Sequence, residues 1–280
     1  MRVVAHLSDL HFGRIRAELL TPLLDSVHAA RPDLVVISGD LTQRARASQF
    51  ADAQRFLAAL PQPVLVVPGN HDVPLDAAWI RLLSPWRRYR RWISRELEPR
   101  YEDAELVVAG INTAAPFTWQ RGWITSRAVT RACGVLGRVQ GRVRLVVTHH
   151  PFVHAPQFVD KALMRGAGRA IRGLAECGTD ILLSGHLHDA RAEVHRVLTP
   201  NGRAVLLVQA GTGLSSRIRG MGNDYNLLRI QGNAVRISRF ATPADQAAFR
   251  CVAETRFARR DDGWGHAGEP VAAEEPAASQ

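Results

Sequence analysis

Near its start, the chain carries the stretch Val3-Val4-Ala5-His6-Leu7-Ser8-Asp9-Leu10-His11, in which a short apolar run is followed directly by polar residues. The run predicts a buried β-strand over residues 3–7. Two further apolar runs, at residues 34–38 and 64–67, flank a segment at 50–60 whose apolar residues repeat with helical spacing. This alternation of strands and helices predicts βαβ units with parallel strands.

The second half of the chain has more and shorter apolar runs. Strands are predicted at residues 105–111, 144–148, 180–184, 192–198, 204–209, 225–230 and 234–240. Turn signals at Pro200-Asn201-Gly202 and Gln231-Gly232-Asn233 predict that the later strands form an antiparallel meander. We therefore expect an α/β fold in which two sheets pack face to face as a β-sandwich flanked by helices.

One domain accounts for most of the chain. We expect it to span residues 1–257, with a helical insertion rich in arginine and aromatic residues at about 75–100. From residue 258 the chain becomes polar and rich in Gly, Pro, Ala and Glu, which predicts a disordered tail at 258–280.

Basic residues outnumber acidic ones, with 36 Lys and Arg against 26 Asp and Glu and a net charge of +10. Such a balance favours anionic partners such as nucleotides, nucleic acid or anionic lipid. Lys161 is the only lysine, so nearly all of the positive charge is arginine, as a GC-rich coding bias would also produce. The charge alone therefore does not choose among these partners.

The cysteines and the apolar runs bear on the compartment. Cys133, Cys177 and Cys251 are far apart in the sequence and odd in number, so we expect reduced thiols. The first apolar run is too short for a signal peptide. No stretch approaches the roughly 20 apolar residues of a membrane span. These observations predict a cytoplasmic protein.

Five short motifs each follow a predicted strand: Asp9-Leu10-His11, Gly39-Asp40, Gly69-Asn70-His71-Asp72, His149-His150 and Gly185-His186-Leu187-His188. Ligands of open α/β sheets bind beyond the carboxyl ends of strands, so the motifs should converge on one rim. Imidazole and carboxylate suit zinc, iron and manganese. A carboxylate such as Asp40 can bridge two ions, which stand about 3.5–4 Å apart in two-metal sites. Each motif alone is commonly structural, but all five together predict a two-metal phosphoesterase.

The five motifs resemble those of the calcineurin-like metallophosphoesterase superfamily, and the resemblance covers residues 2–240. It implies two divalent ions, manganese or iron first, with zinc, cobalt and magnesium as alternatives. One metal site would use Asp9, His11, Asp40 and His188, and the second would use Asp40, Asn70, His149 and His186. His149 is preferred to His150 because the first histidine of similar His-His-Pro segments binds metal.

The resemblance also implies roles for residues that hold no metal. His71 would sit over the phosphate and assist catalysis, and Asp72 would orient it. Asn112 follows another predicted strand on the same rim and is a candidate substrate contact, although it could equally cap the next segment. Arg44 is a second candidate substrate contact.

The motif style narrows the branch of the superfamily. Gln43 stands where Ser/Thr protein phosphatases carry an acidic residue, which argues against that branch. The remaining motifs look like class III cyclic-nucleotide phosphodiesterases and their bacterial relatives. The leading expectation is hydrolysis of a small anionic phosphodiester by a metal-bridging hydroxide, with a 3′,5′-cyclic nucleotide as the first candidate.

Three alternatives stay open. A pyrophosphohydrolase of the UDP-diacylglucosamine type would act at the membrane surface, and the segment Pro85-Trp86-Arg87-Arg88-Tyr89-Arg90-Arg91-Trp92-Ile93 would suit its peripheral contact. The same segment is also explained by an amphipathic helix packed by its aromatic side chains, with solvated arginines. A DNA nuclease is supported only by the basic charge. A non-catalytic scaffold on the same fold is disfavoured because no predicted ligand is missing. The oligomeric state is not predicted.

Overall fold

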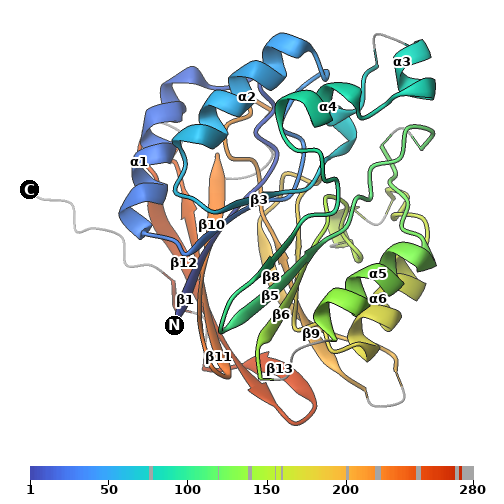
Figure 1. The fold of residues 1–280 in the computed structure, drawn as a ribbon. Helices are drawn as coiled ribbons and strands as arrows, with labels where there is room; N and C mark the ends of the chain where they lie inside the picture. Colours follow the sequence, from blue (N-terminus) through green and yellow to red (C-terminus); the bar gives the residue numbers. More distant parts are fainter. Residues whose placement is uncertain are drawn as a thin grey trace, which may run out of the picture.

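The computed structural model (Figure 1) describes residues 1–75, 78–118, 120–137, 141–154, 156–158, 160–199, 202–217, 222–243, 247–268 and 271–272. Its strands are β1 (Arg2–Leu7), β2 (Leu34–Ile37), β3 (Val64–Val66), β4 (Arg100–Glu102), β5 (Leu106–Gly110), β6 (Val143–Val147), β7 (Ile181–Ser184), β8 (Arg191–Arg196), β9 (Ala204–Gln209), β10 (Asp224–Gln231), β11 (Ala234–Ala241), β12 (Arg250–Arg260), β13 (Gly263–His266) and β14 (Val271–Ala272). Its α-helices are α1 (Leu20–Ala30), α2 (Ala47–Ala59), α3 (Ala78–Leu83), α4 (Arg87–Trp92), α5 (Ser126–Leu136) and α6 (Ala167–Glu176). Short 3₁₀ helices are η1 (Ala17–Leu19), η2 (Asn70–Asp72) and η3 (Pro156–Phe158).

The strands pair in the order β3-β2-β1-β10-β11-β12-β13-β9-β7-β6-β5-β4, with β14 on β12 and β8 on β9. β1, β2 and β3 are parallel, as are β5, β6, β7 and β9. These two parallel groups contain the predicted βαβ units and confirm the α/β class. The first half of this order, β3 to β13, is joined to the second half, β9 to β4, by the pairing of Gly263 in β13 with Ala204 in β9. Because the two halves are joined there, their division into two separate sheets stays a prediction.

The predicted meander is correct only in part. β10, β11 and β12 pair antiparallel in sequence order, and β8 pairs antiparallel with β9. β9, however, pairs in parallel with β7, because its apolar residues extend the buried parallel group. The turn signal at Gln231-Gly232-Asn233 joins β10 to β11 as predicted. Pro200 and Asn201 lie outside the described residues.

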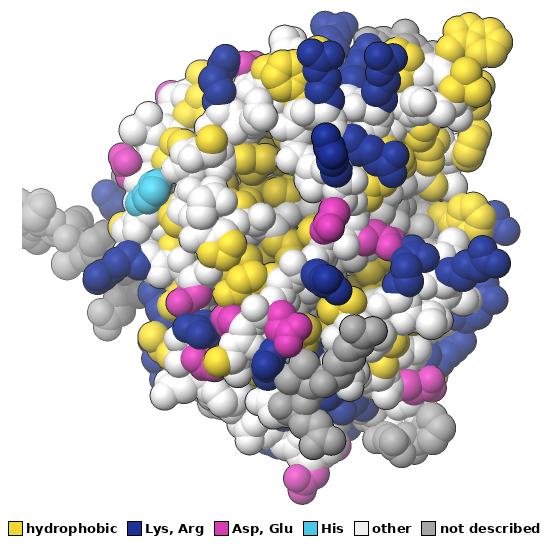
Figure 2. All heavy atoms as spheres, viewed as in Figure 1, with side chains coloured by type: hydrophobic (Ala, Val, Ile, Leu, Met, Phe, Trp, Pro, Cys, Tyr) yellow, Lys and Arg dark blue, Asp and Glu magenta, His cyan; other side chains and the backbone are white. Residues whose placement is uncertain are grey.

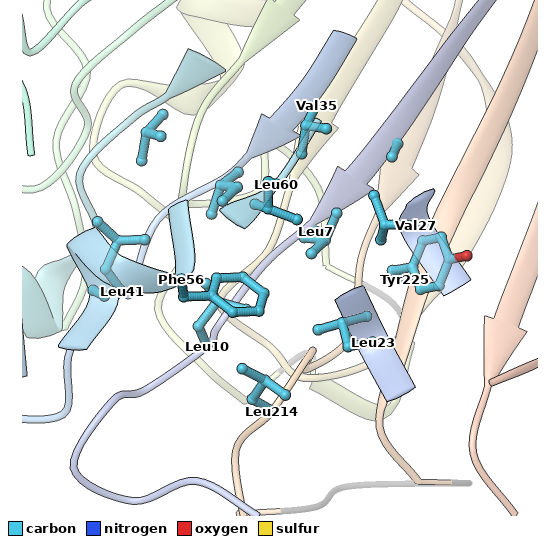
Figure 3. Close-up of a cluster of buried hydrophobic side chains, with 14 of the residues drawn as sticks. Leu7, Leu10, Leu23, Val27, Val35, Leu41, Phe56, Leu60, Leu214 and Tyr225 are labelled. Carbon is cyan, nitrogen blue, oxygen red and sulfur yellow. The ribbon is translucent and has the colours of Figure 1, made fainter. Parts of the chain in front are cut away.

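The buried side chains form three layers. One lies between the two halves of the strand order, where side chains of β1, β2 and β10 meet those of β6, β7 and β9. A second lies under α1 and α2, on the outer face of β1 and β2 (Figures 1 and 3). Leu7, Leu23 and Tyr225 are among its fully buried members. A third layer lies between the strands β5, β6, β7 and β9 and the helices α5 and α6 that cover them. These layers fix the carboxyl ends of the parallel strands relative to one another.

The predicted disordered tail is wrong as far as residue 268. β12 continues to Arg260, and β13 pairs back on it in an antiparallel hairpin. Trp264 of β13 is 2% exposed, and its Nε1 donates to Asp180 Oδ1 at 3.3 Å. Arg259 pairs with the same carboxylate, which is fully buried. One buried acid beside β7 therefore holds the end of the sheet in place, and the domain extends beyond residue 257.

Trp264 gives a direct test of this extension. We expect Trp264→Ala to lower the free energy of unfolding by about 3–5 kcal/mol, because it empties a large site in the core. Urea unfolding followed by circular dichroism measures the loss. Leu198→Ala is the control, since Leu198 is 89% exposed and its replacement should change stability by less than about 0.5 kcal/mol. If the Trp264→Ala protein were as stable as this control, the result would support the prediction of a disordered tail.

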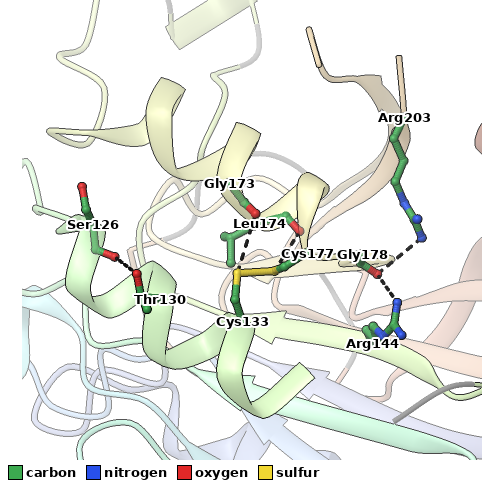
Figure 4. Close-up of a disulfide and its surroundings, with 9 residues drawn as sticks. All are labelled: Ser126, Thr130, Cys133, Arg144, Gly173, Leu174, Cys177, Gly178 and Arg203. Carbon is green, nitrogen blue, oxygen red and sulfur yellow. Dashed lines mark hydrogen bonds between the residues drawn. A yellow bond between two sulfur atoms is a disulfide. The ribbon is translucent and has the colours of Figure 1, made fainter. Parts of the chain in front are cut away.

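The prediction of reduced thiols is also wrong for two of the cysteines. Cys133 of α5 and Cys177, next to the end of α6, form a disulfide with their Cα atoms 5.6 Å apart (Figure 4). The residues are distant in sequence, but α5 and α6 lie side by side on one face of the sheet. Cys251 is a free, exposed cysteine. The thiol argument for the cytoplasm therefore no longer holds, and the compartment stays a prediction.

The arginine-rich segment forms the short helix α4. Tyr89 is fully buried, and its hydroxyl donates to the Val66 carbonyl at 3.2 Å. Trp86 and Ile93 pack against the same core, which confirms that the aromatic face anchors the helix.

On the neighbouring α3, Trp79 and Leu83 are 77% and 78% exposed. Figure 2 shows basic side chains where α4 lies in Figure 1, with hydrophobic side chains at the edge by α3. Peripheral membrane contact stays a prediction; within the described part of the chain, no helix has the length and apolarity to cross a bilayer.

Candidate metal centre and active site

The five motifs converge as predicted. Each directly follows a parallel strand: β1, β2, β3, β6 or β7. Backbone hydrogen bonds fasten their loops together, with Asp9 N donating to the Gly39 carbonyl at 3.1 Å and Gly185 N donating to the His149 carbonyl at 3.0 Å. The side chains therefore meet at one rim of the sheet although they come from a span of 180 residues.

The predicted ligands have an unusual backbone. Among the described residues, positive φ angles outside glycine occur at seven positions, and five of these are predicted ligands: Asp9, His11, Asp40, His186 and His188, with φ between 52° and 76°. A left-handed conformation costs a side-chain-bearing residue about 1–3 kcal/mol, and such strain gathers at functional sites. The loops thus adopt conformations that aim these side chains inward, against the local preference.

Two glycines leave room for the carboxylates. A Cβ on Gly69 would collide with the side chain of Asp40, and a Cβ on Gly185 would stand 2.6 Å from Asp9 Oδ2. Neither glycine has a positive φ. The requirement is therefore close approach of the backbone to a ligand side chain, rather than a turn geometry.

The first ligand group contains Asp9, His11 and His188, with Asp40 at its edge. His188 Nε2 lies 3.1 Å from Asp9 Oδ1 and 3.2 Å from His11 Nε2. His11 Nε2 lies 3.5 Å from Asp9 Oδ1 and 3.7 Å from Asp40 Oδ2. Ligands that bind one ion at about 2.0–2.2 Å stand about 3.0–3.5 Å apart, so these separations suit a single ion.

The second group contains Asp40, Asn70, His149 and His186. His149 Nε2 lies 3.0 Å from Asn70 Oδ1 and 3.2 Å from His186 Nδ1. The same nitrogen lies 3.4 Å from Asp40 Oδ2. Asp40 Oδ2 thus stands within 4 Å of a histidine nitrogen of each group, which is where a bridging carboxylate belongs.

Backbone carbonyls fix which nitrogen of two histidines can bind metal. His149 Nδ1 donates to the Ser38 carbonyl at 2.8 Å, and His188 Nδ1 donates to the Arg217 carbonyl at 3.1 Å. A carbonyl can only accept, so each Nδ1 carries a proton and Nε2 is the ring nitrogen left to bind a metal. Partners of this kind set the orientation of metal-binding imidazoles.

One buried oxygen atom in the first group is placed to bind a cation. Asp9 Oδ2 accepts hydrogen bonds from Ser8 Oγ at 2.6 Å and from His186 N at 2.9 Å. Asp9 Oδ1 is buried and accepts none within the part of the chain that the structure describes. It faces His188 Nε2 at 3.1 Å and His11 Nε2 at 3.5 Å, two nitrogens that can bind metal. The donor set and this orphaned oxygen fit a divalent ion.

The pKa values of the ligand histidines and carboxylates also indicate that the site attracts a cation. Burial lowers the pKa of His149, but the Asp40 carboxylate outweighs burial and raises it to about 9. Burial likewise opposes ionisation of Asp9, yet His188 and His11 bring its pKa well below the usual range. Burial and the neighbouring His149 lower the pKa of His186 to about 3, so its imidazole is neutral. Two buried carboxylates therefore attract positive charge, and a metal must displace the His149 proton to bind.

The geometry favours His149 over His150, but the choice stays a prediction, because His150 lies in one group with His149 and His186 that could hold an ion. His150 Nε2 donates to the Gln120 carbonyl at 3.1 Å, and its Nδ1 lies 2.9 Å from Thr113 Oγ1. Both ring nitrogens are thereby engaged, and burial lowers the pKa of His150 well below its usual range. His150 instead connects the loop of Gln120 to the rim.

His71 stands at the cavity wall, in η2. Its Nδ1 donates to the Gln43 carbonyl at 2.9 Å, which turns the Nε2 side of the ring away from that carbonyl. Its backbone N–H donates to Asp40 Oδ1 at 2.8 Å. His71 also lies close enough to His11 and Asp40 for a ligand role, with ligand atoms within 4.8 Å of one another. The predicted catalytic role of His71 therefore stays a prediction that substitution can decide.

The structure gives Asp72 a different task from the predicted one. Its carboxylate accepts backbone hydrogen bonds from three residues, namely Leu41 (3.2 Å), Thr42 (2.9 Å) and Gly69 (3.0 Å). Burial, followed by the Asp40 charge, raises the pKa of Asp72 to about 6 against these hydrogen bonds. Asp72 thus joins the loops after β2 and β3, while the Gln43 carbonyl orients the His71 ring.

A cavity of about 380 Å³ opens over this centre, and its lining residues are Asp40, Asn70, His71, Gln120, Arg121, Lys161, Ala162, His186, His188 and Arg217. The two predicted substrate contacts are not among them. Asn112 Oδ1 accepts from Ala114 N at 3.0 Å, so it caps its own loop. Arg44 is exposed, and its backbone N–H donates to Gln49 Oε1 at 2.9 Å. The structure therefore does not bring either side chain to the cavity.

Sequence reasoning missed the basic and amide side chains of the wall: Gln120, Arg121, Lys161 and Arg217. They belong to no motif. Their one shared signal is position, because each lies in a loop that follows a predicted strand of the same rim. Lys161, as the only lysine of the chain, carried a second signal.

Comparisons with known proteins agree with this geometry. The model of the calcineurin-like phosphoesterase family matches residues 2–190. The chain is 28% identical over 162 residues to the glycerophosphodiester phosphodiesterase GpdQ of Enterobacter lignolyticus (strain SCF1), covering 53% of this chain and 56% of the relative. It is 25% identical over 207 residues to a probable cyclic nucleotide phosphodiesterase of Pseudoalteromonas sp. (strain SM9913), covering 70% and 74%.

Among solved structures, that of PhoD superposes with a TM-score of 0.70 over 97% of this chain and 72% of the other, at 10% identity, which indicates a shared fold. The match to the first curated relative spans little more than half of that protein's length. The family model covers well over half of this chain and includes all five motifs. The chain therefore belongs to the calcineurin-like phosphoesterase family.

Proposed function

We propose that the chain is a metal-dependent phosphoric ester hydrolase that cleaves small anionic phosphodiesters. The observation that carries this proposal is the pair of ligand groups that share the buried Asp40 at the floor of an open cavity. The names of two relatives, a glycerophosphodiester phosphodiesterase and a probable cyclic nucleotide phosphodiesterase, support a diester substrate. A 3′,5′-cyclic nucleotide is the first candidate within that class.

Residues of this chain have distinct tasks in the proposal. Asp9, His11, Asp40 and His188 would hold one ion, and Asp40, Asn70, His149 and His186 the other. The chemistry that two such ions supply when bound is polarisation of phosphoryl oxygens and activation of water. His71 would donate a proton to the leaving oxygen, since its ring is held at the cavity wall by the Gln43 carbonyl.

The scaffold alternative is disfavoured in this proposal, because all seven predicted ligands lie together at the rim, and Asp9 Oδ1 among them is buried with no hydrogen-bond donor in the described residues. A scaffold would gain nothing from strained ligand backbones. The membrane-surface alternative keeps the support of the exposed Trp79 and Leu83 of α3. The arginines of α4 are not among the residues that line the cavity, so they give a nuclease or lipid substrate no contact at the centre itself.

We expect diesterase activity to exceed monoesterase activity. Protein reconstituted with Mn²⁺ should hydrolyse bis(p-nitrophenyl) phosphate with a kcat/KM at least about tenfold above that for p-nitrophenyl phosphate, or about 1.4 kcal/mol of transition-state stabilisation. Both esters release p-nitrophenolate, so the leaving group does not distinguish them. The reason is that the diester carries one negative charge where the monoester carries two, so it repels a hydroxide nucleophile less. Release of p-nitrophenolate measures both rates.

A panel of natural compounds then chooses among substrates. It should compare cyclic nucleotides, UDP-diacylglucosamine and single-stranded DNA under the same metal loading. A phosphopeptide serves as the contrary case, because Gln43 replaces the acid of protein phosphatases. A strong preference for the phosphopeptide, or for the monoester, would contradict the proposed class.

A further inference from the structure

We infer that the cavity contains an anion-binding subsite, formed by Arg121, Lys161 and Arg217, beside the metal centre. The inference rests on the proposed function and adds a substrate class to it. The preferred phosphodiesters would carry a second anionic group, such as a terminal phosphate, on the part of the molecule that is not the scissile diester.

The charge of the cavity exceeds what a simple diester needs. Asp40 is the only acidic residue among those that line the cavity in the described structure, and its carboxylate faces the ligand histidines. Two divalent ions held by Asp9 and Asp40 already leave a positive balance for the scissile group. The three basic side chains add to that balance, and guanidinium and ammonium groups are the usual partners of phosphate.

Arg121 is fixed by its neighbours. Its Nε donates to the Leu163 carbonyl at 2.9 Å, which keeps the guanidinium at the wall. The preceding carbonyl, of Gln120, accepts from His150 Nε2 at 3.1 Å. His150 is buried beside the ligand His149, so the loop that carries Arg121 is anchored at the metal centre itself.

The loop that carries Lys161 is joined to the loop of Arg121. Arg165 N donates to the Gly122 carbonyl at 3.2 Å, and Ile124 N donates to the Arg165 carbonyl at 2.9 Å. The two loops therefore form one continuous wall with two cations on it. Lys161 Nζ lies 4.8 Å from the centre of the Phe158 ring, a cation–π contact with the ammonium group.

Arg217 lies in the loop between β9 and β10. Its carbonyl accepts from Nδ1 of the ligand His188 at 3.1 Å, and its N–H donates to Ser215 Oγ at 3.1 Å. The backbone of Arg217 is thus held one hydrogen bond away from a metal ligand. The anchored backbone of these loops loses little conformational freedom when an anion binds, which lowers the entropic cost of binding.

The identity of residue 161 strengthens the assignment. Every other basic residue of the chain is arginine, which a coding bias explains. Its one lysine lies at the wall of the cavity. A compact ammonium on a flexible stem can follow a phosphate whose position varies between substrates, whereas a guanidinium prefers a fixed planar geometry.

A matched pair of substrates tests the subsite. Thymidine 5′-(p-nitrophenyl phosphate) and its 3′-phosphorylated form share the scissile diester and differ by one phosphate. We expect the 3′-phosphate to lower KM at least about tenfold, the order of one charge-assisted hydrogen bond. Titration calorimetry with thymidine 5′-monophosphate and thymidine 3′,5′-bisphosphate should show the same preference without turnover. Added salt should reduce it.

The variant Arg121→Gln/Lys161→Gln/Arg217→Gln should lose the preference and keep two metal ions. Its control is Arg87→Gln/Arg90→Gln/Arg91→Gln on α4, which removes the same charge from residues that do not line the cavity and should keep the preference. Equal KM for the two esters in the unmodified protein, or a preference that survives in the cavity variant, would overturn the subsite while leaving the phosphodiesterase intact. Tight bisphosphate binding without hydrolysis of either ester would support the subsite and reject the proposed function.

Discussion

Replacing Asp40 with asparagine is expected to remove most of the bound metal and, with it, the hydrolytic activity. Asp40 Oδ2 stands 3.7 Å from His11 Nε2 and 3.4 Å from His149 Nε2, so its charge serves both ligand groups. Replacing a residue that only hydrogen-bonds to a metal ligand already lowers the affinity for the metal by about 10–100-fold. Replacing a ligand that bridges two ions should lower it by more. Elemental analysis at saturating Mn²⁺ should fall from two ions per chain to one or fewer.

Asp224→Asn is the matched control for Asp40→Asn. Both carboxylates are 1% exposed, but Asp224 pairs with Arg239 and belongs to neither ligand group. The control should therefore keep two ions per chain, even where its stability drops. Circular dichroism should confirm that Asp40→Asn folds, since asparagine can still accept the hydrogen bond from His71 N. Two ions retained by a folded Asp40→Asn protein would exclude the bridging role.

Much of the site was predictable because metal ligands occupy positions that sequence can reveal. Asp9, Asp40 and His149 each follow an apolar run, and the carboxyl ends of parallel strands share one rim. The ligand set came from the resemblance to the superfamily, and the structure brings all seven side chains together at that rim. The fine geometry was not predictable, since the left-handed backbone of Asp9 and Asp40 follows from the packing of several loops together.

The errors share a different cause. Asp72 was assigned to His71 because they are adjacent in sequence, but its carboxylate is buried where backbone N–H groups need acceptors. Asn112 was assigned to the substrate from its position at the rim, and Arg44 was a further candidate. Loop side chains turn toward whichever partner their own loop offers, and that choice leaves no periodic signal.

Long-range pairing explains what was missed in the fold. Polar composition after residue 258 indicated disorder, but β12 and β13 are held by Trp264 and Arg259 at the buried Asp180. Asp180 lies about 80 residues earlier in the chain. The Cys133–Cys177 disulfide depends in the same way on how α5 and α6 pack. Such contacts become visible only when the topology is known.

His71→Ala is expected to keep both ions and the fold but to lose kcat by about 10²–10⁴-fold, the usual contribution of a general acid. The His71 ring is held by the Gln43 carbonyl at 2.9 Å, and the backbone around it is held by Asp40. Removing the ring loses the hydrogen bond to Gln43, but it leaves the backbone hydrogen bond to Asp40 in place. By contrast, His188→Ala should lose metal, because His188 Nε2 faces Asp9 Oδ1 and His11.

Leaving-group dependence separates proton donation from the alternative role of His71 as a ligand. A p-nitrophenolate departs without a proton, so the loss in His71→Ala should shrink for bis(p-nitrophenyl) phosphate and be full for an alkyl leaving group such as that of a cyclic nucleotide. His28→Ala, a histidine on the outer surface of α1, is the control and should match the unmodified protein. If His71→Ala instead loses metal as His188→Ala does, its place in the group with His11 and Asp40 is that of a ligand. Equal losses for both leaving groups, with both ions present, would leave charge stabilisation of the phosphate as the role of the imidazole rather than proton transfer.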